Sequence, residues 1–391
     1  MIPTTRPLKG LRVLDLSQGV AGPHCGGLFA EYGADVIKVE PPTGDWMRVL
    51  GAGYDGRSSS FIYYNRGKKS LCLDLKSNGA VNVVLNLAAM SDVVIDNNRP
   101  GVSDRLGIGF EMLKERNPQI IVVAVSGFGL EGPDSRRPLS DTIAQALSGF
   151  MAINCGRADV PAKVDMTLID CLTGLYAFQA ATMALWGDPS DREAQLVDVS
   201  LVQSAAAIQG AKVLEYSVHN KMPAKINAPA GSYKASDGWL ALTLVRETDW
   251  SNICKTFGRL DLAIDPRFVT FADRAVHTDE LTEIVDDIIA SRTVAEWVSQ
   301  FQDNGVLAGP INDYGMWLDD PQTTAIEGAP RFPVAADAQA PIVRTPGHGH
   351  HSALSPHLGE HSREILAEAG LNEADISRML ANGSVICKQV A

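Results

Sequence analysis

Short apolar segments alternate with longer helix-forming segments through the first half of the chain. We expect strands at 11–16, 35–40, 92–96 and 119–125, with helices at about 23–32, 80–90 and 110–115. Strands that are apolar along their whole length are typical of a parallel sheet covered on both faces. The pattern therefore predicts an α/β fold with a doubly wound sheet.

The second half of the chain continues the pattern and then changes composition. We expect helices at 140–151, 172–186, 200–216, 250–257, 279–290, 294–303 and 362–369, and strands at 195–199 and 239–245. The segment Asn227-Ala-Pro-Ala-Gly231 has the composition of a linker. A chain of 391 residues is too long for one small core. We predict a large domain at 1–224, a small α+β domain at 225–330, and a linker with a C-terminal return to the large domain at 331–391.

Composition and charge narrow the classes of function. The chain is 45% hydrophobic and 20% charged, which is ordinary for a globular protein. Its net charge of −12 argues against general binding of nucleic acids. No apolar run looks long enough to cross a bilayer, and the N-terminus has no apolar signal core, so we expect a cytoplasmic protein. The six scattered cysteines have no metal-binding spacing and fit free thiols.

The acidic residue Asp170 interrupts an apolar stretch just before the predicted helix at 172–186. One interpretation is structural, because aspartate is a favourable N-cap. The other is chemical: the N-terminus of a helix stabilises an anion, so a partly buried aspartate there can stay ionised and act as a nucleophile. The local sequence leaves both interpretations open. The neighbouring Cys171 fits a small buried hydrophobic residue.

The first predicted strand leads into a turn that contains Gly19, Gly22, Gly26 and Gly27. Glycines between a strand and a helix are typical of phosphate binding, and Glu40 lies near the position of a ribose-binding acid in dinucleotide folds. The spacing G-x-G-x-x-G is absent, however, which argues against a nicotinamide site. The alternative is that the glycines permit close packing between helix and sheet.

Basic residues form three clusters near predicted turns: Arg66 with Lys68 and Lys69, Arg99 with Arg105, and Arg136 with Arg137. Each cluster alone is typical of a solvated surface. At the strand ends of one sheet, the clusters together would suit a polyanion such as a nucleotide tail, because a guanidinium donates two hydrogen bonds to phosphate at once. The histidines of Gly347-His-Gly-His-His351 have no carboxylate close by in sequence, and we predict no metal site.

Several motifs spread over most of the chain form one pattern. They are Leu8-Lys-Gly-Leu-Arg-Val-Leu-Asp-Leu-Ser17 with Tyr32-Gly-Ala-Asp-Val-Ile-Lys-Val-Glu-Pro-Pro42, Asn65-Arg-Gly-Lys-Lys-Ser-Leu-Cys-Leu-Asp-Leu-Lys76, Asp96-Asn-Asn-Arg-Pro-Gly101 with Asp104-Arg-Leu-Gly107, Ser126-Gly-Phe-Gly-Leu-Glu-Gly-Pro133 and Pro356-His-Leu-Gly-Glu-His361. In combination they resemble the signatures of family III CoA-transferases, the CaiB/BaiF group, which includes formyl-CoA, carnitine and bile-acid CoA-transferases. The resemblance covers about residues 8–370.

The resemblance implies a fold and a reaction. The fold is a large Rossmann-like domain with a parallel sheet built from both chain ends, a smaller α+β domain between them, and an interlocked homodimer. The reaction moves CoA from an acyl-CoA to a carboxylic acid through an anhydride and a CoA thioester on Asp170. Coenzyme A and acyl-CoA are then substrates, and no permanently bound cofactor is implied. We expect neither a nucleic acid nor a membrane as a partner.

Two groups of residues are expected to serve such a site. We expect the backbone N–H groups near Gly19, Val20 and Ala21 to stabilise the oxyanions of tetrahedral intermediates. The side chains expected to bind CoA are Lys68, Lys69, Asn97, Arg99, Arg105 and Arg137.

The chain departs from the family pattern near the predicted helix at 140–151. Family members commonly have an aromatic residue and an acid there, and this chain has Leu139 and Ser140 in those places. Racemases that share the fold use a His/Asp pair, and the histidine would fall at Ser140, which argues against racemisation. An acyl-CoA racemase or epimerase, and a catalytically silent CoA-binding protein, are the alternatives.

Overall fold

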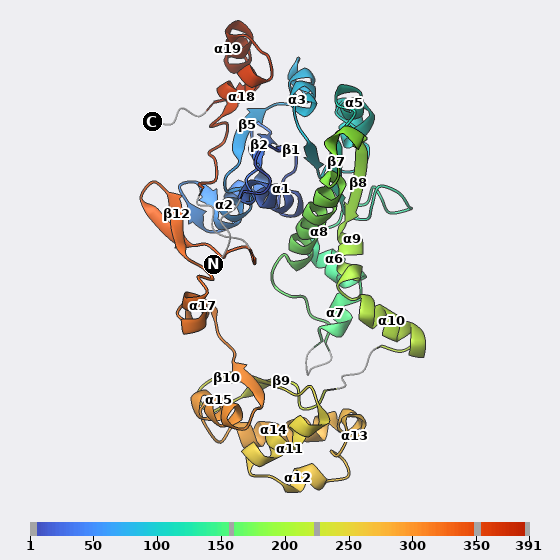
Figure 1. Cartoon of the computed structure of the whole chain (residues 1–391), viewed down its shortest axis with the longest axis vertical. Coiled ribbons are helices and arrows are strands. Elements are labelled where there is room, and N and C mark those ends of the chain that lie inside the picture. Colours follow the sequence, from blue (N-terminus) through green and yellow to red (C-terminus); the bar gives the residue numbers. More distant parts are fainter. Residues whose placement is uncertain (1–5, 156–159, 223–226, 348–352, 388–391) are drawn as a thin grey trace. The chain divides into compact units, whose positions relative to one another are not determined.

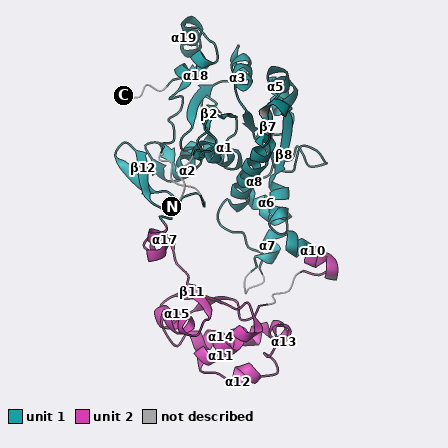
Figure 2. Cartoon of the chain, in the orientation of Figure 1, with its two compact units in different colours: residues 1–214, 327–391 teal, residues 215–326 magenta. Residues whose placement is uncertain are grey.

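The computed structural model describes residues 6–155, 160–222, 227–347 and 353–387. The chain forms two compact units, residues 1–214 with 327–391 and residues 215–326 (Figure 2). The larger unit therefore contains both ends of the chain. The functional domain boundaries at 224/225 and 330/331 remain a sequence prediction, and the two units are described separately below.

The larger unit is built on a seven-stranded sheet with the strand order β14-β5-β2-β1-β6-β7-β8 (Figure 1). Its strands are β1 (Arg12–Asp15), β2 (Asp35–Glu40), β5 (Lys69–Leu73), β6 (Val93–Asp96), β7 (Ile121–Ser126), β8 (Gln195–Ser200) and β14 (Val385–Ile386). The first six are parallel, whereas β14 runs antiparallel to β5. The prediction of a parallel sheet is therefore corrected to a mixed, mostly parallel one. An antiparallel strand at the edge of a parallel sheet is a common addition.

Helices cover both faces of this sheet, and successive strand residues point to opposite faces. Val13 belongs to a core with α1 (Ala21–Glu31) and α8 (Leu168–Leu185). Leu14 belongs to a second core on the other face. The helices of that second core are α3 (Ala80–Ala89), α5 (Phe110–Arg116), α18 (Ser362–Glu368) and α19 (Glu373–Ala381). The doubly wound arrangement follows from apolar residues on both sides of each strand.

Two predicted helices are each divided into two. The helix expected at 140–151 becomes α6 (Asp141–Leu147) and α7 (Phe150–Ile153), because Gly149 has a φ of +83°. The helix expected at 200–216 becomes α9 (Leu201–Ala207) and α10 (Gly210–His219). Apolar periodicity does not reveal such breaks when apolar residues continue across them.

Helix α8 begins four residues before the predicted start at Leu172. Among the described residues it is the one helix that is long and apolar enough to span a membrane, with 18 residues and a mean hydropathy of 1.3. The expectation that no apolar run reaches this length is therefore wrong. The buried residues Gly174, Ala177 and Ala181 pack against α1 and the sheet, which explains the apolar composition of this side of the helix alone, because other apolar residues of α8 such as Leu175 and Met183 are exposed.

The remaining elements of the larger unit are short. They are η1 (Trp46–Val49), β3 (Gly53–Tyr54), β4 (Arg57–Ser58), α2 (Ser59–Asn65), α4 (Val102–Leu106), η2 (Pro189–Asp191), β12 (Arg331–Ala335) and β13 (Ala338–Pro341). Strands β12 and β13 form a hairpin.

The smaller unit is α+β. Its three antiparallel strands are β9 (Gly231–Lys234), β10 (Trp239–Thr243) and β11 (Leu307–Pro310). Its helices are α11 (Glu247–Phe257), α12 (Asp261–Ile264), α13 (Phe271–Val276), α14 (Thr278–Ile289), α15 (Val294–Asp303), α16 (Tyr314–Leu318) and α17 (Pro321–Ala325). The core contains the buried rings of Trp250, Phe268, Trp297 and Phe301. This unit therefore has a hydrophobic core of its own.

Candidate active site

An open pocket lies beyond the carboxyl ends of β1, β6 and β7, and it holds about 320 Å³ of space. The chain runs from β1 through β2 to β5 in one direction along the sheet, and from β6 through β7 to β8 in the other. The pocket therefore lies where the strand order reverses, which is the preferred ligand position in open α/β sheets. Three strand ends contribute to its lining: Gln18, Val20 and Ala21 after β1, 97–100 after β6, and 125–127 at the end of β7. The rest of the lining is Trp46, Ser135, 137–141, Asp170 and Leu201.

Asp170 is the third residue of α8 and lines this pocket. The structure thus places it inside the first turn, and the helix begins before it, so the N-cap interpretation is wrong. Burial and the neighbouring Asp141 raise the pKa of Asp170 to about 7. Among the described residues, no hydrogen-bond donor contacts its carboxylate. Near neutral pH both the acid and the carboxylate of Asp170 are therefore populated.

The N–H groups at the start of α8 donate to another carboxylate. Asp141 Oδ1 accepts from the backbone N of Ile169 at 2.6 Å and from the backbone N of Asp170 at 3.1 Å. Thr167, at the N-cap position, makes no side-chain cap. Asp141, from α6, therefore caps α8 from a distance in sequence. The expectation that the helix N-terminus keeps Asp170 ionised needs correction, because its N–H donors go to Asp141 and the pKa of Asp170 is raised.

The β1–α1 turn forms another side of the pocket. The N–H of Gly19 donates to both oxygens of Asp45, at 3.1 and 3.2 Å, so it is not available to an oxyanion. Val20 and Ala21 line the pocket, and the described residues provide no acceptor for their N–H groups. Of the three predicted oxyanion donors, the structure thus leaves two available and removes Gly19.

Close packing explains the glycines of this turn. A Cβ atom on Gly22 would lie 2.3 Å from that of Ser17, and one on Gly27 would lie 2.6 Å from the carbonyl oxygen of Tyr64. Gly19 has a φ of +84°, and a Cβ there would lie 2.6 Å from the Trp46 ring. A Cβ on Gly26 would lie 2.8 Å from Oδ2 of Asp15, on β1, so the alternative of close packing between helix and sheet is supported at Gly26. Gly22 packs against the turn after β1, and Gly27 packs against α2.

The predicted CoA-binding residues separate into two groups. Asn97, Arg99 and Arg137 line the pocket that contains Asp170. Asn97 also donates to the carbonyl of Gln18 at 2.7 Å and accepts from its N–H at 3.0 Å, and so it fixes the β1–α1 turn. Arg105 lies on α4 and is exposed, outside the lining of this pocket.

Lys68 and Lys69 do not reach the pocket. Lys68 is buried, and its Nζ lies 2.7 Å from Asp15 Oδ2 and 2.8 Å from the carbonyl of Pro23. Lys69 forms an ion pair with Glu364 at 3.0 Å. The structure therefore does not bring these two cations to the site, although the sequence places them in the same motif. The spacing of residues in the sequence did not reveal that Lys68 and Lys69 form ion pairs with carboxylates of the same chain.

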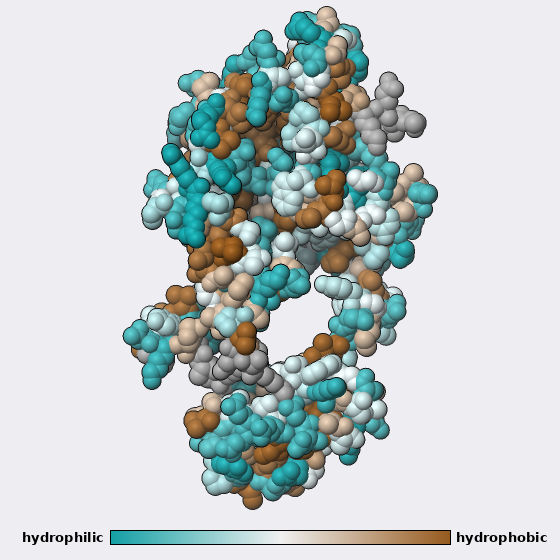
Figure 3. Space-filling model, turned by 180° about the vertical axis from the view of Figure 1, so that it is seen from behind, coloured by the Kyte–Doolittle hydropathy of each residue, from teal (hydrophilic) through white to brown (hydrophobic). Residues whose placement is uncertain are grey.

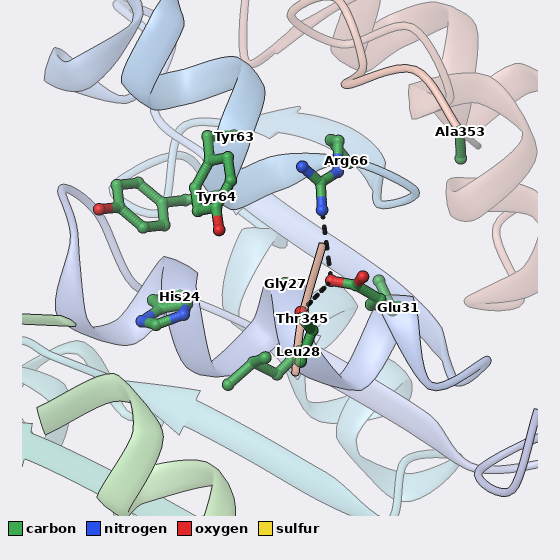
Figure 4. A pocket seen from close by; sticks show the side chains of 10 residues that line it. His24, Gly27, Leu28, Glu31, Tyr63, Tyr64, Arg66, Thr345 and Ala353 are labelled. Carbon is green, nitrogen blue, oxygen red and sulfur yellow. Dashed lines mark hydrogen bonds and ion pairs between the residues drawn. The ribbon is translucent and has the colours of Figure 1, made fainter. Parts of the chain in front are cut away.

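A second pocket lies beside α1 and α2 (Figure 4). Its lining includes His24, Tyr63 and Tyr64 at one side, and Arg66, Glu31 and Thr345, which are joined by hydrogen bonds, at the other (Figure 4). The pocket holds about 20 Å³, which is space for about one water molecule and not for an acyl-CoA. Tyr64 reaches α8 from this side, with its hydroxyl 3.0 Å from Sγ of Cys171.

Metal binding has no support among the residues that the structure describes, which contain no group of three or more His, Cys, Asp or Glu side chains able to hold an ion. Residues 348–352, which include the histidines of the Gly-His segment, lie outside the described residues. The prediction of no metal site there stays a prediction.

Sequence comparison identifies the family. The model of CoA-transferase family III matches residues 8–362, which is most of the chain. The chain belongs to CoA-transferase family III. The motif resemblance found in the sequence is thereby confirmed, and so is the assignment of the protein as a CoA-transferase.

Relatives of this family III CoA-transferase match over nearly their full length. A succinyl-CoA–D-citramalate CoA-transferase from Chloroflexus aurantiacus is 33% identical, with 96% of this chain and 97% of the relative covered. A succinate–glutarate CoA-transferase from Agrobacterium fabrum is 31% identical, with 93% and 95% covered. The crystal structure of a CaiB/BaiF family protein from Brucella suis is 29% identical, with a TM-score of 0.83 and 94% and 100% covered. The α/β fold with its mixed sheet thus matches a solved member.

Proposed function

We propose that the protein transfers CoA from an acyl-CoA to a carboxylic acid through covalent intermediates on Asp170. The observation that carries the proposal is a half-buried carboxylate in the pocket at the switch point of the sheet, without a hydrogen-bond donor among the described residues. A carboxylate that forms no internal hydrogen bond keeps its lone pairs for a substrate.

The first half of the reaction follows from the groups present. A carboxylate oxygen of Asp170 forms a bond to the thioester carbon, the C–S bond breaks, and CoA leaves as a thiolate. The product is a mixed anhydride. The thiolate then attacks the aspartyl carbonyl of this anhydride, the donor acid leaves as a carboxylate, and CoA becomes bound to Asp170 as a thioester.

The second half reverses these steps with the acceptor. The acceptor carboxylate attacks the carbonyl of the aspartyl thioester, the C–S bond breaks, and CoA leaves as a thiolate, so that a new mixed anhydride forms between Asp170 and the acceptor. The thiolate then attacks the acceptor's acyl carbon, which produces the acceptor's CoA thioester and regenerates the Asp170 carboxylate. Every step exchanges activated acyl groups of similar energy.

Other groups in the pocket support this chemistry. Val20 and Ala21 line the pocket at the start of α1, where a helix N-terminus favours an oxyanion. We assign the CoA phosphates to Arg99 and Arg137, whose guanidinium groups suit phosphate oxygens. Asn97 is assigned a polar contact to CoA at the same strand end.

Hydroxylamine trapping tests the proposal. Incubation of the protein with an acyl-CoA and hydroxylamine is expected to leave an aspartyl hydroxamate at Asp170, detected as a modified peptide by mass spectrometry. A racemase would instead exchange the α-hydrogen of the acyl group for deuterium in heavy water. A silent CoA-binding protein would do neither. Exchange without hydroxamate, or no reaction across a broad panel of acyl-CoA donors, contradicts the proposal.

We also propose that the protein works in the cytoplasm as an interlocked homodimer. All six cysteines are free, which fits a reducing compartment. Apolar side chains on α8, β8 and α10 and at the end of α8 are exposed in the single chain, including Met183, Trp186, Leu196 and Leu214. Apolar residues also gather in patches between hydrophilic ones on the face shown in Figure 3. Light scattering on the purified protein, with an expected mass twice 41.9 kDa, tests the dimer.

A further inference from the structure

We propose that Asp141 is the positioning residue for the nucleophile: its carboxylate holds the first turn of α8 and takes the N–H donors that would otherwise stabilise the carboxylate of Asp170. This inference rests on the proposed role of Asp170. It assigns a function to a residue that the sequence motifs left without one.

The geometry begins with the hydrogen bonds. Asp141 is buried, and Oδ1 accepts the N–H groups of both Ile169 and Asp170, which are the second and third residues of α8. A normal N-cap side chain accepts from these same positions, but here the cap comes from 28 residues away in sequence. The position of the Asp170 main chain is therefore fixed by α6.

The carboxylate of Asp141 is itself held in place by a hydrogen bond from a buried glutamine. Nε2 of the buried residue Gln145 donates to Asp141 Oδ2 at 2.7 Å, and Oε1 of the same amide accepts from the N–H of Val164 at 2.9 Å. The side chain of Gln145 thus connects Asp141 to the segment that leads into α8. Such a buried and satisfied network holds its members in one arrangement.

The position of Asp141 also changes the electrostatic environment of Asp170. An aspartate in the first turn of a helix normally gains stability as an anion from the free N–H groups. Here Asp141 occupies that position, and its charge lies beside Asp170. The pKa of Asp170 is consequently raised by burial first and by Asp141 second. A more basic carboxylate is a stronger nucleophile toward a thioester and a poorer leaving group from the anhydride.

The other titratable groups around the pocket do not replace Asp141 in this role. Arg99 and Arg137 line the same pocket and carry the opposite charge. His24, on α1, contacts the carbonyl of Cys171, and burial lowers its pKa to about 4, so that it is neutral near pH 7. Cys171 and Tyr64 face each other, and burial raises the pKa of both groups, which keeps them neutral as well. Asp141 is thus the anion that acts on Asp170.

The test removes the negative charge of Asp141 and keeps an oxygen that accepts hydrogen bonds at the same position. Asp141→Asn keeps an oxygen able to accept from Ile169 and Asp170. The ionisation of Asp170 is measured by ¹³C NMR of protein labelled at aspartate carboxyls, with Asp170→Asn used to assign the signal. We expect a midpoint near pH 7 in the wild type. In Asp141→Asn we expect it about one unit lower.

Activity provides a second readout. The single-turnover rate of hydroxamate formation should fall at acidic pH, and in Asp141→Asn this acid limb should move in the same direction and by the same amount as the NMR midpoint. Asp165→Asn is the matched control, because Asp165 is an exposed carboxylate five residues before Asp170 that pairs with Lys163. It removes the same charge and is expected to leave the midpoint unchanged. A merely structural role of Asp141 would lower the rate at every pH without moving the limb.

The outcomes separate this inference from the proposed function. A wild-type midpoint near pH 4, or equal midpoints in wild type and folded Asp141→Asn, overturns the role of Asp141. A wild-type midpoint near pH 4 contradicts this role even if the variant does not fold. A wild type that forms no hydroxamate with any acyl-CoA overturns the proposed function instead, while the NMR midpoints still report on Asp141.

Discussion

Two groups of buried charges lie close to the same pocket, and they are built in opposite ways. Around the β1–α1 turn, Lys38 pairs with Asp45 at 2.9 Å, Lys68 with Asp15 at 2.7 Å, and Arg48 with Glu40 at 2.6 Å. At the start of α8, by contrast, Asp141 and Asp170 are two acids side by side, without a cation paired to either among the described residues. The first group is internally neutralised and the second is not.

The difference shows in the ionisation of the acids. Although burial opposes ionisation, Lys68 and Lys38 hold the pKa of Asp15 below its usual value. Burial and a like charge raise the pKa of Asp170 to about 7. Asp15 is fully buried and Asp170 is half-buried, yet it is Asp15 whose pKa is lowered, so the neighbouring charge decides between them. Paired charges hold the turn in place, whereas the acid without a cation is available for chemistry.

The largest effect is expected from removal of the nucleophile. Asp170→Asn or Asp170→Ala should lower turnover by on the order of 10⁴-fold. The other carboxylate of the pocket, Asp141, cannot replace it, because its oxygens accept hydrogen bonds from Ile169, Asp170 and Gln145. Binding of CoA, measured by calorimetry, should stay within about threefold, since Arg99 and Arg137 are untouched. Asp165→Asn serves as the control with normal turnover. Normal turnover in Asp170→Asn would remove the central assignment.

Removal of a cation from the group of paired charges should lower the free energy of unfolding. Lys68→Met leaves Asp15 buried without its cation, and we expect the free energy of unfolding to fall by about 3–5 kcal/mol. The neighbour Lys69 provides the matched control, because its ion pairs lie at the surface. Lys69→Met should cost less than about 1 kcal/mol. Urea unfolding of both variants measures the difference. Equal losses in the free energy of unfolding would contradict a larger contribution from the buried pair.

Replacement of Asp170, whose ionised form is disfavoured by burial and by Asp141, should stabilise the fold. The folded-state pKa of Asp170, about 7, lies above the ordinary value of 3.8, so the folded protein binds the extra proton between these values. The contribution of Asp170 to stability is therefore intact below about pH 4 and is lost as pH rises to about 7. Asp170→Asn should raise the free energy of unfolding by on the order of 2 kcal/mol at pH 8 and by little at pH 4. The same gain at both pH values would contradict the raised pKa.

The smallest effect is expected for an exposed cation at the pocket. Arg99 is exposed, and the described residues offer its guanidinium no ion-pair partner. Arg99→Gln should weaken CoA binding by about three- to tenfold through loss of a contact to phosphate. The change should be larger for CoA than for a pantetheine thioester, which lacks the nucleotide phosphates. Lys69→Gln, at a half-buried cation outside the pocket, should leave both affinities unchanged.

Much of the fold was visible in the sequence. The strand at Asp35–Glu40 and the helix at Val294–Asp303 have the predicted bounds, because apolar patterning and turn residues act locally. The strand Lys69–Leu73 was not predicted as a strand, although its motif was recognised. Strand β14, with two residues, was also missed, because so short a segment carries no periodicity. Its antiparallel pairing with β5 depends on contacts across more than 300 residues.

The sequence by itself determined the alternation of strands and helices, the family motifs and the choice of Asp170, since these depend on residue types at short spacing. Tertiary structure decided what each charge does. Lys68 and Lys69 are adjacent in a motif, yet one is buried against Asp15 and the other pairs at the surface. Asp141 gained its role from a hydrogen bond to a helix 28 residues away. Burial and the distance between charges set these outcomes, and both arise only when the chain is folded.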